Sequence, residues 1–254
     1  HNRSVFTFAG EAVSLEHAIT SLYEAVVPAV DLRTHRGVHP RLGAVDVVPF
    51  VPLEGSTMAD CVSLAHRVGE AIAGRFQIPV FLYEQAARSP DRRNLSDVRR
   101  GGFERLADRM AAGFLPDFGP RQPHPSAGAS AVGARRLLVA FNVNLSTRRL
   151  EVADAIARAI RYSNGGLPCV KALGLPLEDR AIVQVSMNLT DYQRTSIREA
   201  FEAVAREAMK RGVEVLESEI IGLAPAAALD EETAAAIKLT GDWREKVLER
   251  KLSA

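Results

Sequence analysis

The chain lacks the features that mark several specialised protein classes. No apolar run in its 254 residues approaches the ~20 residues of a membrane-spanning helix, and no signal peptide is recognisable. Cysteine is scarce. Cys61 and Cys169 lie in apolar helix-like and strand-like surroundings, which predicts buried thiols in a reducing compartment. We therefore expect a cytoplasmic protein without structural disulfides.

An excess of charge of one sign is also missing. Lys and Arg together number 32 and Asp and Glu 31, which gives a formal net charge of +1. A general nucleic-acid binder needs a basic excess to neutralise phosphates, so this balance argues against that function. A local basic pocket for a small anion stays compatible with the composition.

Common catalytic signatures are absent as well. The pairs Gly119-Pro120 and Gly165-Gly166 do not have the spacing of a phosphate-binding loop. We find no Gly-x-Ser-x-Gly sequence and no Ser-His-Asp motif that would indicate a serine hydrolase.

What the chain does contain is enough apolar residues for a large core. The hydrophobic fraction is 47% and the charged fraction 25%, both near the average of soluble globular proteins. The length suits one large domain or two of ordinary size. The chain opens at His1, just before a strand-like run, and reads as if it began inside a domain.

The spacing of apolar residues predicts a β-α-β-α-β order in the first half. Thr57 and Asp60 resemble a capping box at the start of the second helix. A polar, basic stretch follows the third strand, and a region rich in Gly, Pro, Ala and Ser predicts a long loop or linker. The predicted strands are 4–8, 45–51 and 79–83, the helices 11–30, 57–76 and 103–112, the basic stretch 84–100 and the loop 113–130.

The second half has the order βαββαβ, which is the ferredoxin-like arrangement. Its predicted strands are 136–144, 170–175, 181–188 and 213–221, its helices 150–162 and 195–211, and residues 225–252 are expected to be helical. We predict an α+β fold of two ferredoxin-like (βαββαβ-type) subdomains with mixed or antiparallel sheets and helices packed on them. The boundaries are 1–133 and 134–254, and the first subdomain is expected to be incomplete at its N-terminus.

The segment 31–50 concentrates groups that could do chemistry in a loop that ends on an apolar strand. Pro40 restricts the backbone of His39 to extended conformations, and a neutral imidazole can act as a general base near neutral pH. The alternative is a structural histidine that hydrogen-bonds its own loop, which is the commoner role for a lone loop histidine. His35 lies four residues earlier and could share a zinc ion with His39, but no third ligand stands out.

Charged residues around His39 have two interpretations each. Arg41 follows the His-Pro pair and is the arginine of this loop best placed to bind a carboxylate, whereas Arg33 and Arg36 fit solvated loop charges better. Asp46 interrupts an apolar strand. It either points inward to a partner in the loop or outward from an alternating strand. The arginines of the basic stretch 84–100 are more typical of a solvated face.

Two further candidates lie beyond this segment. The loop 117–128 has several prolines and glycines, which specify a rigid path that could wrap a flat ligand; the alternative is a plain interdomain linker. Asn142 and Asn144 could bind a polar ligand or simply end their strand.

Several segments resemble the glutamate formiminotransferase family in sequence and in order. The longest is His39-Pro40-Arg41-Leu42-Gly43-Ala44-Val45-Asp46-Val47-Val48-Pro49-Phe50. The others are residues 2–8, 80–88, 116–120, 140–145, 184–189 and 222–225. The resemblance covers residues 1 to about 229 and is far more specific than one motif.

The resemblance implies transfer of the formimino group from N-formimino-L-glutamate to tetrahydrofolate, a co-substrate, in histidine degradation. The family's catalytic histidine falls on His39, and no metal is implied. Arg41 and Arg88 are plausible clamps for substrate carboxylates, by our own inference. The folate-binding loop of the family falls on Gly119, Pro120, Arg121, Gln122, Pro123, His124, Pro125, Ser126, Ala127 and Gly128.

The chain also departs from the family pattern. Members normally carry a further N-terminal segment, in which an acidic partner for His39 could lie, and some carry a cyclodeaminase domain that is absent here. Ala127 stands where some members have an aromatic residue. Two alternatives therefore stay open: a formyltransferase acting between 5-formyltetrahydrofolate and glutamate, and a folate-binding protein without catalysis. The expected partners are small molecules and, in a homodimer, a second copy, with neither nucleic acid nor membrane.

Overall fold

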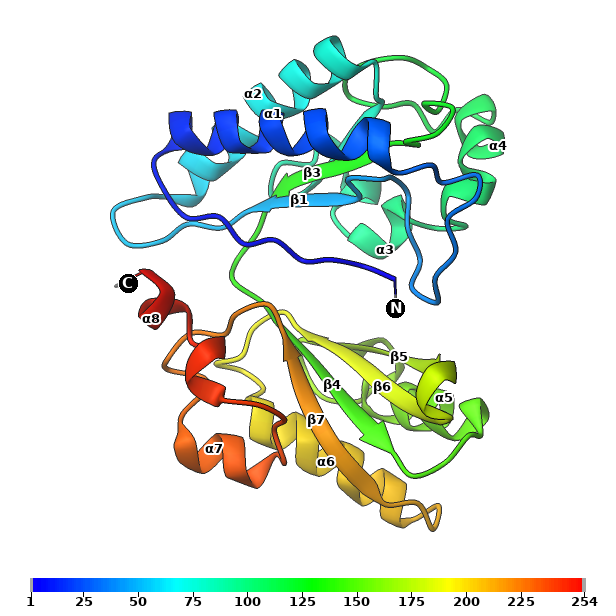
Figure 1. The fold of residues 1–254 in the computed structure, drawn as a ribbon, viewed down its shortest axis with the longest axis vertical. Helices are drawn as coiled ribbons and strands as arrows, with labels where there is room; N and C mark the ends of the chain where they lie inside the picture. Colours follow the sequence, from blue (N-terminus) through cyan, green and yellow to red (C-terminus); the bar gives the residue numbers. More distant parts are fainter. Residues whose placement is uncertain (1, 253–254) are drawn as a thin grey trace. The chain divides into compact units, whose positions relative to one another are not determined.

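The computed structural model describes residues 2–252 and divides the chain into two compact units (Figure 1). The first unit comprises Phe8–Arg136, and the second runs from Leu137 onward and includes Arg3–Thr7. The predicted boundary after Gly133 falls inside a strand, so the division lies slightly later in the chain. The α+β class with two subdomains is confirmed.

The first unit is built on a parallel sheet with helices on both faces. Its strands β1 (Val47–Phe50), β2 (Val80–Glu84) and β3 (Ser130–Ala134) have the order β1-β3-β2, and β3 pairs parallel with both neighbours. Helices α1 (Ala12–Ala29) and α2 (Met58–Phe76) lie on one face (Figure 1). The short helices α3 (Leu95–Val98) and α4 (Leu106–Ala111) belong to a second cluster on the other face.

Alternate side chains of β2 and β3 explain this double coverage. Leu82 and Val132 belong to the cluster under α1 and α2, whereas Phe81 and Ala131 belong to the cluster under α3 and α4. A sheet buried on both faces has continuously apolar strands, as parallel sheets usually do. The prediction of a mixed or antiparallel sheet was therefore wrong for this unit.

Strand β3 was missed because its sequence is Ser-Ala-Val-Gly-Ala, which has little side-chain volume and resembles a linker. The packing requires that composition. A Cβ added at Gly133 would lie 2.5 Å from the Tyr83 carbonyl oxygen. The hydroxyl of Ser130 accepts a hydrogen bond from the buried Tyr23 hydroxyl (2.7 Å) and donates one to the Val45 carbonyl (2.6 Å). Small residues thus let β3 fit between two strands that precede it in sequence.

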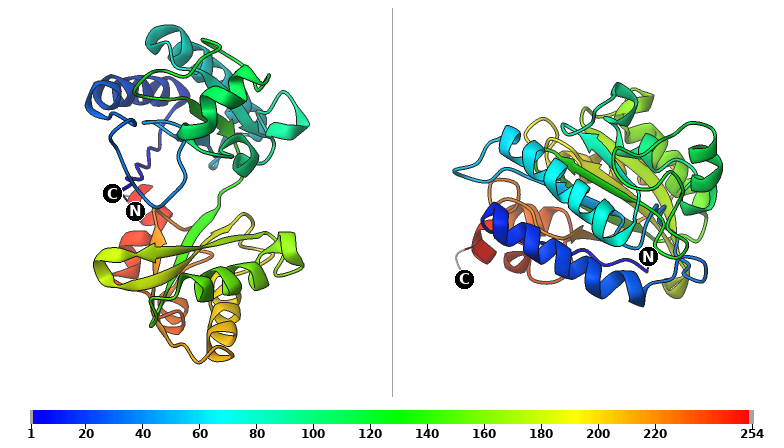
Figure 2. Two further views of the ribbon diagram at one scale, coloured as in Figure 1. Left: turned by 90° about the vertical axis from the view of Figure 1, so that its right-hand side faces the viewer. Right: turned by 90° about the horizontal axis from the view of Figure 1, so that it is seen from above.

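The second unit is ferredoxin-like, as predicted. Its sheet has the order β5-β6-β4-β7 with antiparallel neighbours throughout. Helices α5 and α6 cover the same face of this sheet (Figure 2). The elements in chain order are β4 (Val139–Leu145), α5 (Leu150–Ile160), β5 (Val170–Leu177), β6 (Ile182–Leu189), α6 (Ile197–Met209) and β7 (Val215–Ile221).

The chain ends differ from the predictions. Residues 4–8 form no strand within the described part of the chain, and Val5 and Phe6 are 61% and 64% exposed. The helical region predicted after Pro225 is broken into α7 (Glu231–Ala236), a 3₁₀ turn and α8 (Leu248–Leu252). No helix among the described residues is long and apolar enough to cross a membrane.

Candidate functional site

His39 lies in the loop that joins α1 to β1. Its side chain is half-buried, and its Nδ1 atom is 3.3 Å from the Pro40 carbonyl oxygen. A carbonyl oxygen can only accept a hydrogen bond, so in this contact Nδ1 carries the proton. In a neutral ring, Nε2 is then the nitrogen with the lone pair, which is the atom that a general base uses.

Asp46 points inward and holds the backbone that follows His39. One carboxylate oxygen accepts hydrogen bonds from the backbone N–H groups of Leu42 (2.7 Å) and Gly43 (3.4 Å). The other oxygen pairs with the Arg99 guanidinium at 2.6 Å. Of the two interpretations of Asp46, the inward one is therefore confirmed.

The basic stretch 84–100 is only in part a solvated face. Arg99 and Arg92 are mostly buried, with 16% and 14% of their side chains exposed, and each forms an ion pair, with Asp46 and Asp117 respectively. Arg100 is 73% exposed and fits the solvated interpretation. The expectation of a solvated face was wrong for Arg92 and Arg99, because each reaches a buried carboxylate on another segment.

Arg41 is occupied by contacts within the protein. Its guanidinium pairs with Glu104 at 2.7 Å and donates to the carbonyl oxygens of Leu32 (3.3 Å) and His35 (3.2 Å). Although partial burial opposes it, the hydrogen bond from Arg41 lowers the pKa of Glu104. These contacts commit Arg41 to holding the loop in shape, which argues against the predicted contact with a substrate carboxylate.

The end of the candidate folate loop packs directly on the His39 loop. The Ala44 N–H donates to the Ala127 carbonyl (3.0 Å), and Gly43 and Gly128 form an isolated antiparallel bridge. Gly128 has φ +69°, and an added Cβ would lie 2.2 Å from the Leu42 carbonyl oxygen. The structure thus brings together the two segments that the sequence singled out.

Within this loop, His124 has a structural role. Its Nδ1 accepts a hydrogen bond from the Ala127 N–H (3.0 Å), and its backbone exchanges two hydrogen bonds with Gly128. These contacts close a tight turn over residues 124–128. The preceding part of the loop contains the exposed residues Arg121 and Gln122, whose side chains face solvent.

Arg88 is the candidate clamp that remains available. Its side chain is exposed, and its guanidinium lies over the Phe118 ring, 4.6 Å from the ring centroid. Stacking orients a guanidinium without consuming its N–H donors, so Arg88 can still bind a carboxylate at its edge. Phe118 directly precedes the candidate folate loop.

Asn142 and Asn144 belong to a polar network in the second unit. Asn142 donates to Glu219 (3.1 Å) and Asn144 to Glu217 (3.0 Å), while the buried Gln184 amide donates to Asn144 and Glu219, both at 2.8 Å. Hydrogen bonding to Asn144 and pairing with Arg180 lower the pKa of Glu217. Neither asparagine simply ends its strand.

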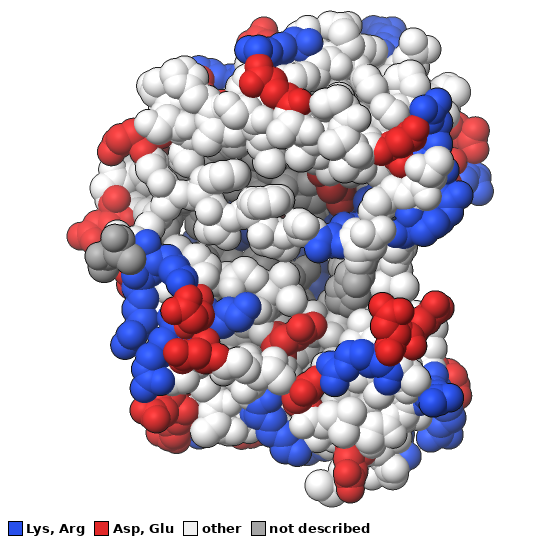
Figure 3. All heavy atoms as spheres, viewed as in Figure 1, with Lys and Arg blue, Asp and Glu red and all other residues white. Residues whose placement is uncertain are grey.

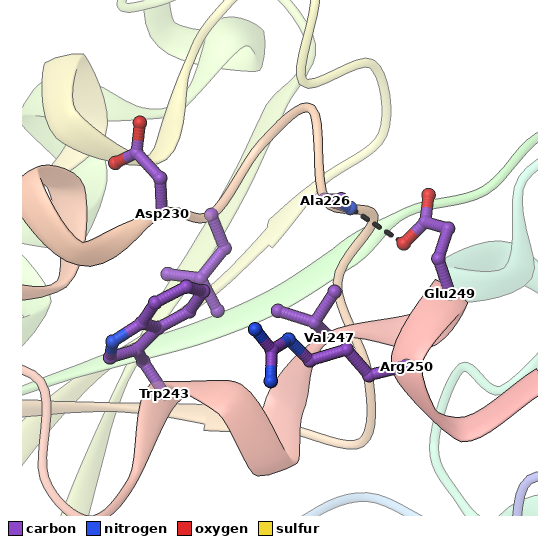
Figure 4. Close-up of a pocket in the computed structure, with 7 residues that line it drawn as sticks. Ala226, Asp230, Trp243, Val247, Glu249 and Arg250 are labelled. Carbon is purple, nitrogen blue, oxygen red and sulfur yellow. Dashed lines mark hydrogen bonds between the residues drawn. The ribbon is translucent and has the colours of Figure 1, made fainter. Parts of the chain in front are cut away.

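A hollow in the second unit contains none of the predicted site residues. It has a volume of about 570 Å³ and is lined by α8, the preceding turn and the segment before α7 (Figure 4). Trp243 and Arg250 project into it, and the Glu249 carboxylate accepts a hydrogen bond from the Ala226 N–H at 2.7 Å. Residues 2–252 include no group of three or more His, Cys, Asp or Glu side chains arranged to hold a metal.

Sequence reasoning missed Arg99, Arg109 and Glu104, which support the His39 loop from the segment between β2 and β3. Nothing in the basic stretch 84–100 distinguishes an inward arginine from a solvated one. The need of an inward Asp46 for a positive partner could have pointed to Arg99, but no sequence signal indicates Arg109 or Glu104.

Both halves of the chain match models of known protein families. Residues 1–135 match the model of the formiminotransferase domain, N-terminal subdomain, and residues 140–240 match that of the formiminotransferase domain. Glutamate formimidoyltransferase of Streptococcus pyogenes serotype M1 is 44% identical over 254 residues, which cover 99% of this chain and 85% of that protein.

Two further relatives are also named as formimidoyltransferases. The glutamate formimidoyltransferase of Thermoplasma acidophilum is also 44% identical, over 99% of this chain and 84% of its own length. Formimidoyltransferase-cyclodeaminase of Rattus norvegicus is 38% identical over 90% of this chain, which spans 43% of that longer protein.

Proposed function

Because the chain belongs to the formiminotransferase family, we propose that it transfers the formimino group of N-formimino-L-glutamate to tetrahydrofolate and releases glutamate. Within the first unit, one observation supports this most directly. The His39 loop and the loop of residues 119–128 pack on each other through the Gly43–Gly128 bridge. A base and a segment able to contact folate are thereby held side by side.

In the proposed reaction the folate N5 attacks the amidine carbon of formiminoglutamate, and a new C–N bond forms. His39 Nε2 accepts the proton that N5 loses, and the resulting imidazolium donates a proton to the glutamate nitrogen as the old C–N bond breaks. The proton count balances, because the proton taken from one nitrogen is returned to the other. No external oxidant or reductant is needed.

Residues around this centre have proposed roles in binding. Residues 119–128 contact the folate, with the exposed part of the loop facing the ligand and the 124–128 turn fixing its position. Arg88, oriented by Phe118, binds a substrate carboxylate. Holding two substrates in reacting geometry supplies a large part of the rate enhancement in such a transfer.

The test is a direct assay. Protein, formiminoglutamate and tetrahydrofolate are mixed, and the folate product is followed spectroscopically. Turnover supports the proposal. Turnover with 5-formyltetrahydrofolate and glutamate alone would favour the formyltransferase alternative, and folate binding without either reaction would favour a binding protein.

His39→Ala should lower turnover by at least about 100-fold, the lower end of the contribution of a general base. Folding should be retained, because the half-buried ring lies in a loop whose backbone is held by Asp46 and Arg41. Millimolar imidazole should restore part of the activity. Turnover equal to that of the unsubstituted protein would contradict the assignment of the base.

A homodimer is also part of the proposal for this chain. Light scattering on the purified protein checks it, with the monomer mass of 27.5 kDa as the reference.

A further inference from the structure

The segment between β2 and β3 carries an arginine that is held in place by another arginine. The Arg109 guanidinium donates to the carbonyl oxygens of Asp97 (3.0 Å), Val98 (2.8 Å) and Arg100 (2.8 Å). These carbonyls flank Arg99 on both sides. Arg109 therefore fixes the turn from which Arg99 projects.

Arg99 reaches from this turn to the backbone beside His39. One of its terminal nitrogens donates both to the Pro40 carbonyl oxygen and to the Asp46 carboxylate. Arg99 and Asp46 are only 16% and 17% exposed at their side chains, which limits the screening of their ion pair by solvent. Asp46 in turn accepts from the N–H groups of Leu42 and Gly43.

All of these contacts converge on a single short segment, residues 40–43. An ion pair that only joined two elements would not need three separate contacts to the backbone that follows His39. The Pro40 carbonyl matters most, because it accepts from Arg99 and also lies 3.3 Å from His39 Nδ1. The same oxygen therefore connects the arginine to the imidazole.

We propose that Arg99, anchored by Asp46 and Arg109, is a positioning residue that fixes the Pro40 carbonyl and thereby holds His39 as the Nδ1–H tautomer with Nε2 as the base. The proposal rests on His39 being the base of the transfer. The proposal also assigns a role to α3 and α4, because these short helices flank the turn from which Arg99 projects.

The kinetic test compares substitutions at both partners. Arg99→Ala should lower kcat by about 10- to 100-fold, because misplacing a catalytic group by about 1 Å can cost about 100-fold, while KM changes little. Arg99→Lys keeps the charge but replaces the guanidinium with a single ammonium group, so its kcat should be intermediate. Asp46→Asn keeps an oxygen acceptor and should lose less than Asp46→Ala.

The control is an ion pair of the same unit that does not touch the loop. Arg67 pairs with Glu16 at 2.6 Å between α2 and α1, with 51% of its side chain exposed. Arg67→Ala should leave kcat unchanged. Guanidinium at millimolar concentration should restore part of the kcat of Arg99→Ala but not that of His39→Ala. Full activity of Arg99→Ala would overturn the proposal.

A second readout is independent of turnover. In protein labelled with ¹⁵N-histidine, the His39 ring, assigned by comparison with His39→Gln, should show a protonated Nδ1 at a pH where the ring is neutral. Arg99→Lys, the variant least disruptive to folding, should shift the ring toward the other tautomer. A wild-type ring protonated at Nε2 would overturn the proposal.

The two readouts separate the positioning role from the proposed function. If the tautomer depends on Arg99 but the protein transfers no formimino group, the proposed function is wrong and the positioning role stands. If transfer is normal but the tautomer does not depend on Arg99, the positioning role is wrong and the proposed function stands.

Discussion

Gly128 lies where the two candidate loops pack closely on each other. Gly128→Ala combines a left-handed backbone at φ +69° with a Cβ 2.2 Å from the Leu42 carbonyl oxygen. We expect it to lower the free energy of unfolding by about 3 kcal/mol, from overpacking and backbone strain together. Urea unfolding measures this loss, and the assay should show a parallel loss of transfer.

Gly113→Ala is the matched control for this substitution. Gly113 has φ +100°, but nothing lies within 4 Å of an added Cβ. Only the backbone strain should remain, so the loss should be about 1 kcal/mol. Equal losses for both variants would show that the contact between the loops adds nothing.

At the residue scale, the sequence could single out Asp46, because a carboxylate interrupts an apolar strand there, but it left open whether the side chain points inward or outward. The catalytic role of His39 stays a prediction, made because proline restricts its backbone. The role of Arg41 could not be predicted, because its partners Glu104 and Leu32 lie 63 and 9 residues away along the chain. Adjacency to His39 suggested a ligand contact, but burial turned the side chain toward the protein.

Helix α6 begins with a capping box whose carboxylate responds to pH. The Ser196 hydroxyl accepts from the Glu199 N–H (3.2 Å), and the Glu199 carboxylate accepts from the Ser196 N–H (2.8 Å). The carboxylate also accepts from the Ser196 hydroxyl (2.8 Å), and the hydrogen bonds from the Ser196 N–H and hydroxyl lower the pKa of Glu199 below its ordinary 4.5. A lowered folded-state pKa contributes stability above the unfolded value, and this contribution is lost as the pH falls through the folded value.

Ser196→Ala should therefore destabilise the protein by about 1 kcal/mol at neutral pH, the usual cost of removing a cap. The difference from wild type should shrink as the pH falls from the ordinary 4.5 through the lowered folded-state pKa, because the contribution of the carboxylate is lost over that range. Urea midpoints measured at neutral pH and along an acid series test this. A difference that grows on acidification would contradict the assigned role of the carboxylate.

Elements with a strong periodicity of apolar residues were predictable from the sequence, whereas strand β3, which has no such periodicity, was not. The helix 57–76, with its capping box at Thr57, was found within one residue as Met58–Phe76, because apolar spacing and a cap agree there. Strand β3 has no large side chain to form a pattern. Its place in the sheet depends on how closely neighbouring strands approach, which a sequence pattern does not record.

For the whole molecule, the two units have separate hydrophobic cores. Phe141 is fully buried in the second, and Phe141→Ala should cost about 3–5 kcal/mol. We expect faster hydrogen exchange in β4–β7 and little change in β1–β3. Mass-spectrometric exchange on the full chain measures both, and equal acceleration in the two sheets would show that the units unfold as one.

The absence of nucleic-acid binding stays a prediction from composition. On the face drawn in Figure 3, positive and negative side chains are interspersed. We expect no salt-dependent binding of duplex DNA in a gel-shift titration, because releasing counterions from phosphates requires a concentrated basic surface.

The central position of β3 has a consequence for synthesis on the ribosome. A nascent chain that has emerged as far as β2 already contains His39 and both outer strands, but not the strand that separates them. The Tyr23–Ser130 hydrogen bond closes a span of 107 residues, so the unit completes its sheet through a distant contact. Until residues 124–134 leave the exit tunnel, the outer strands expose edges that β3 does not yet pair. We expect a chaperone to bind the nascent chain most readily during that interval.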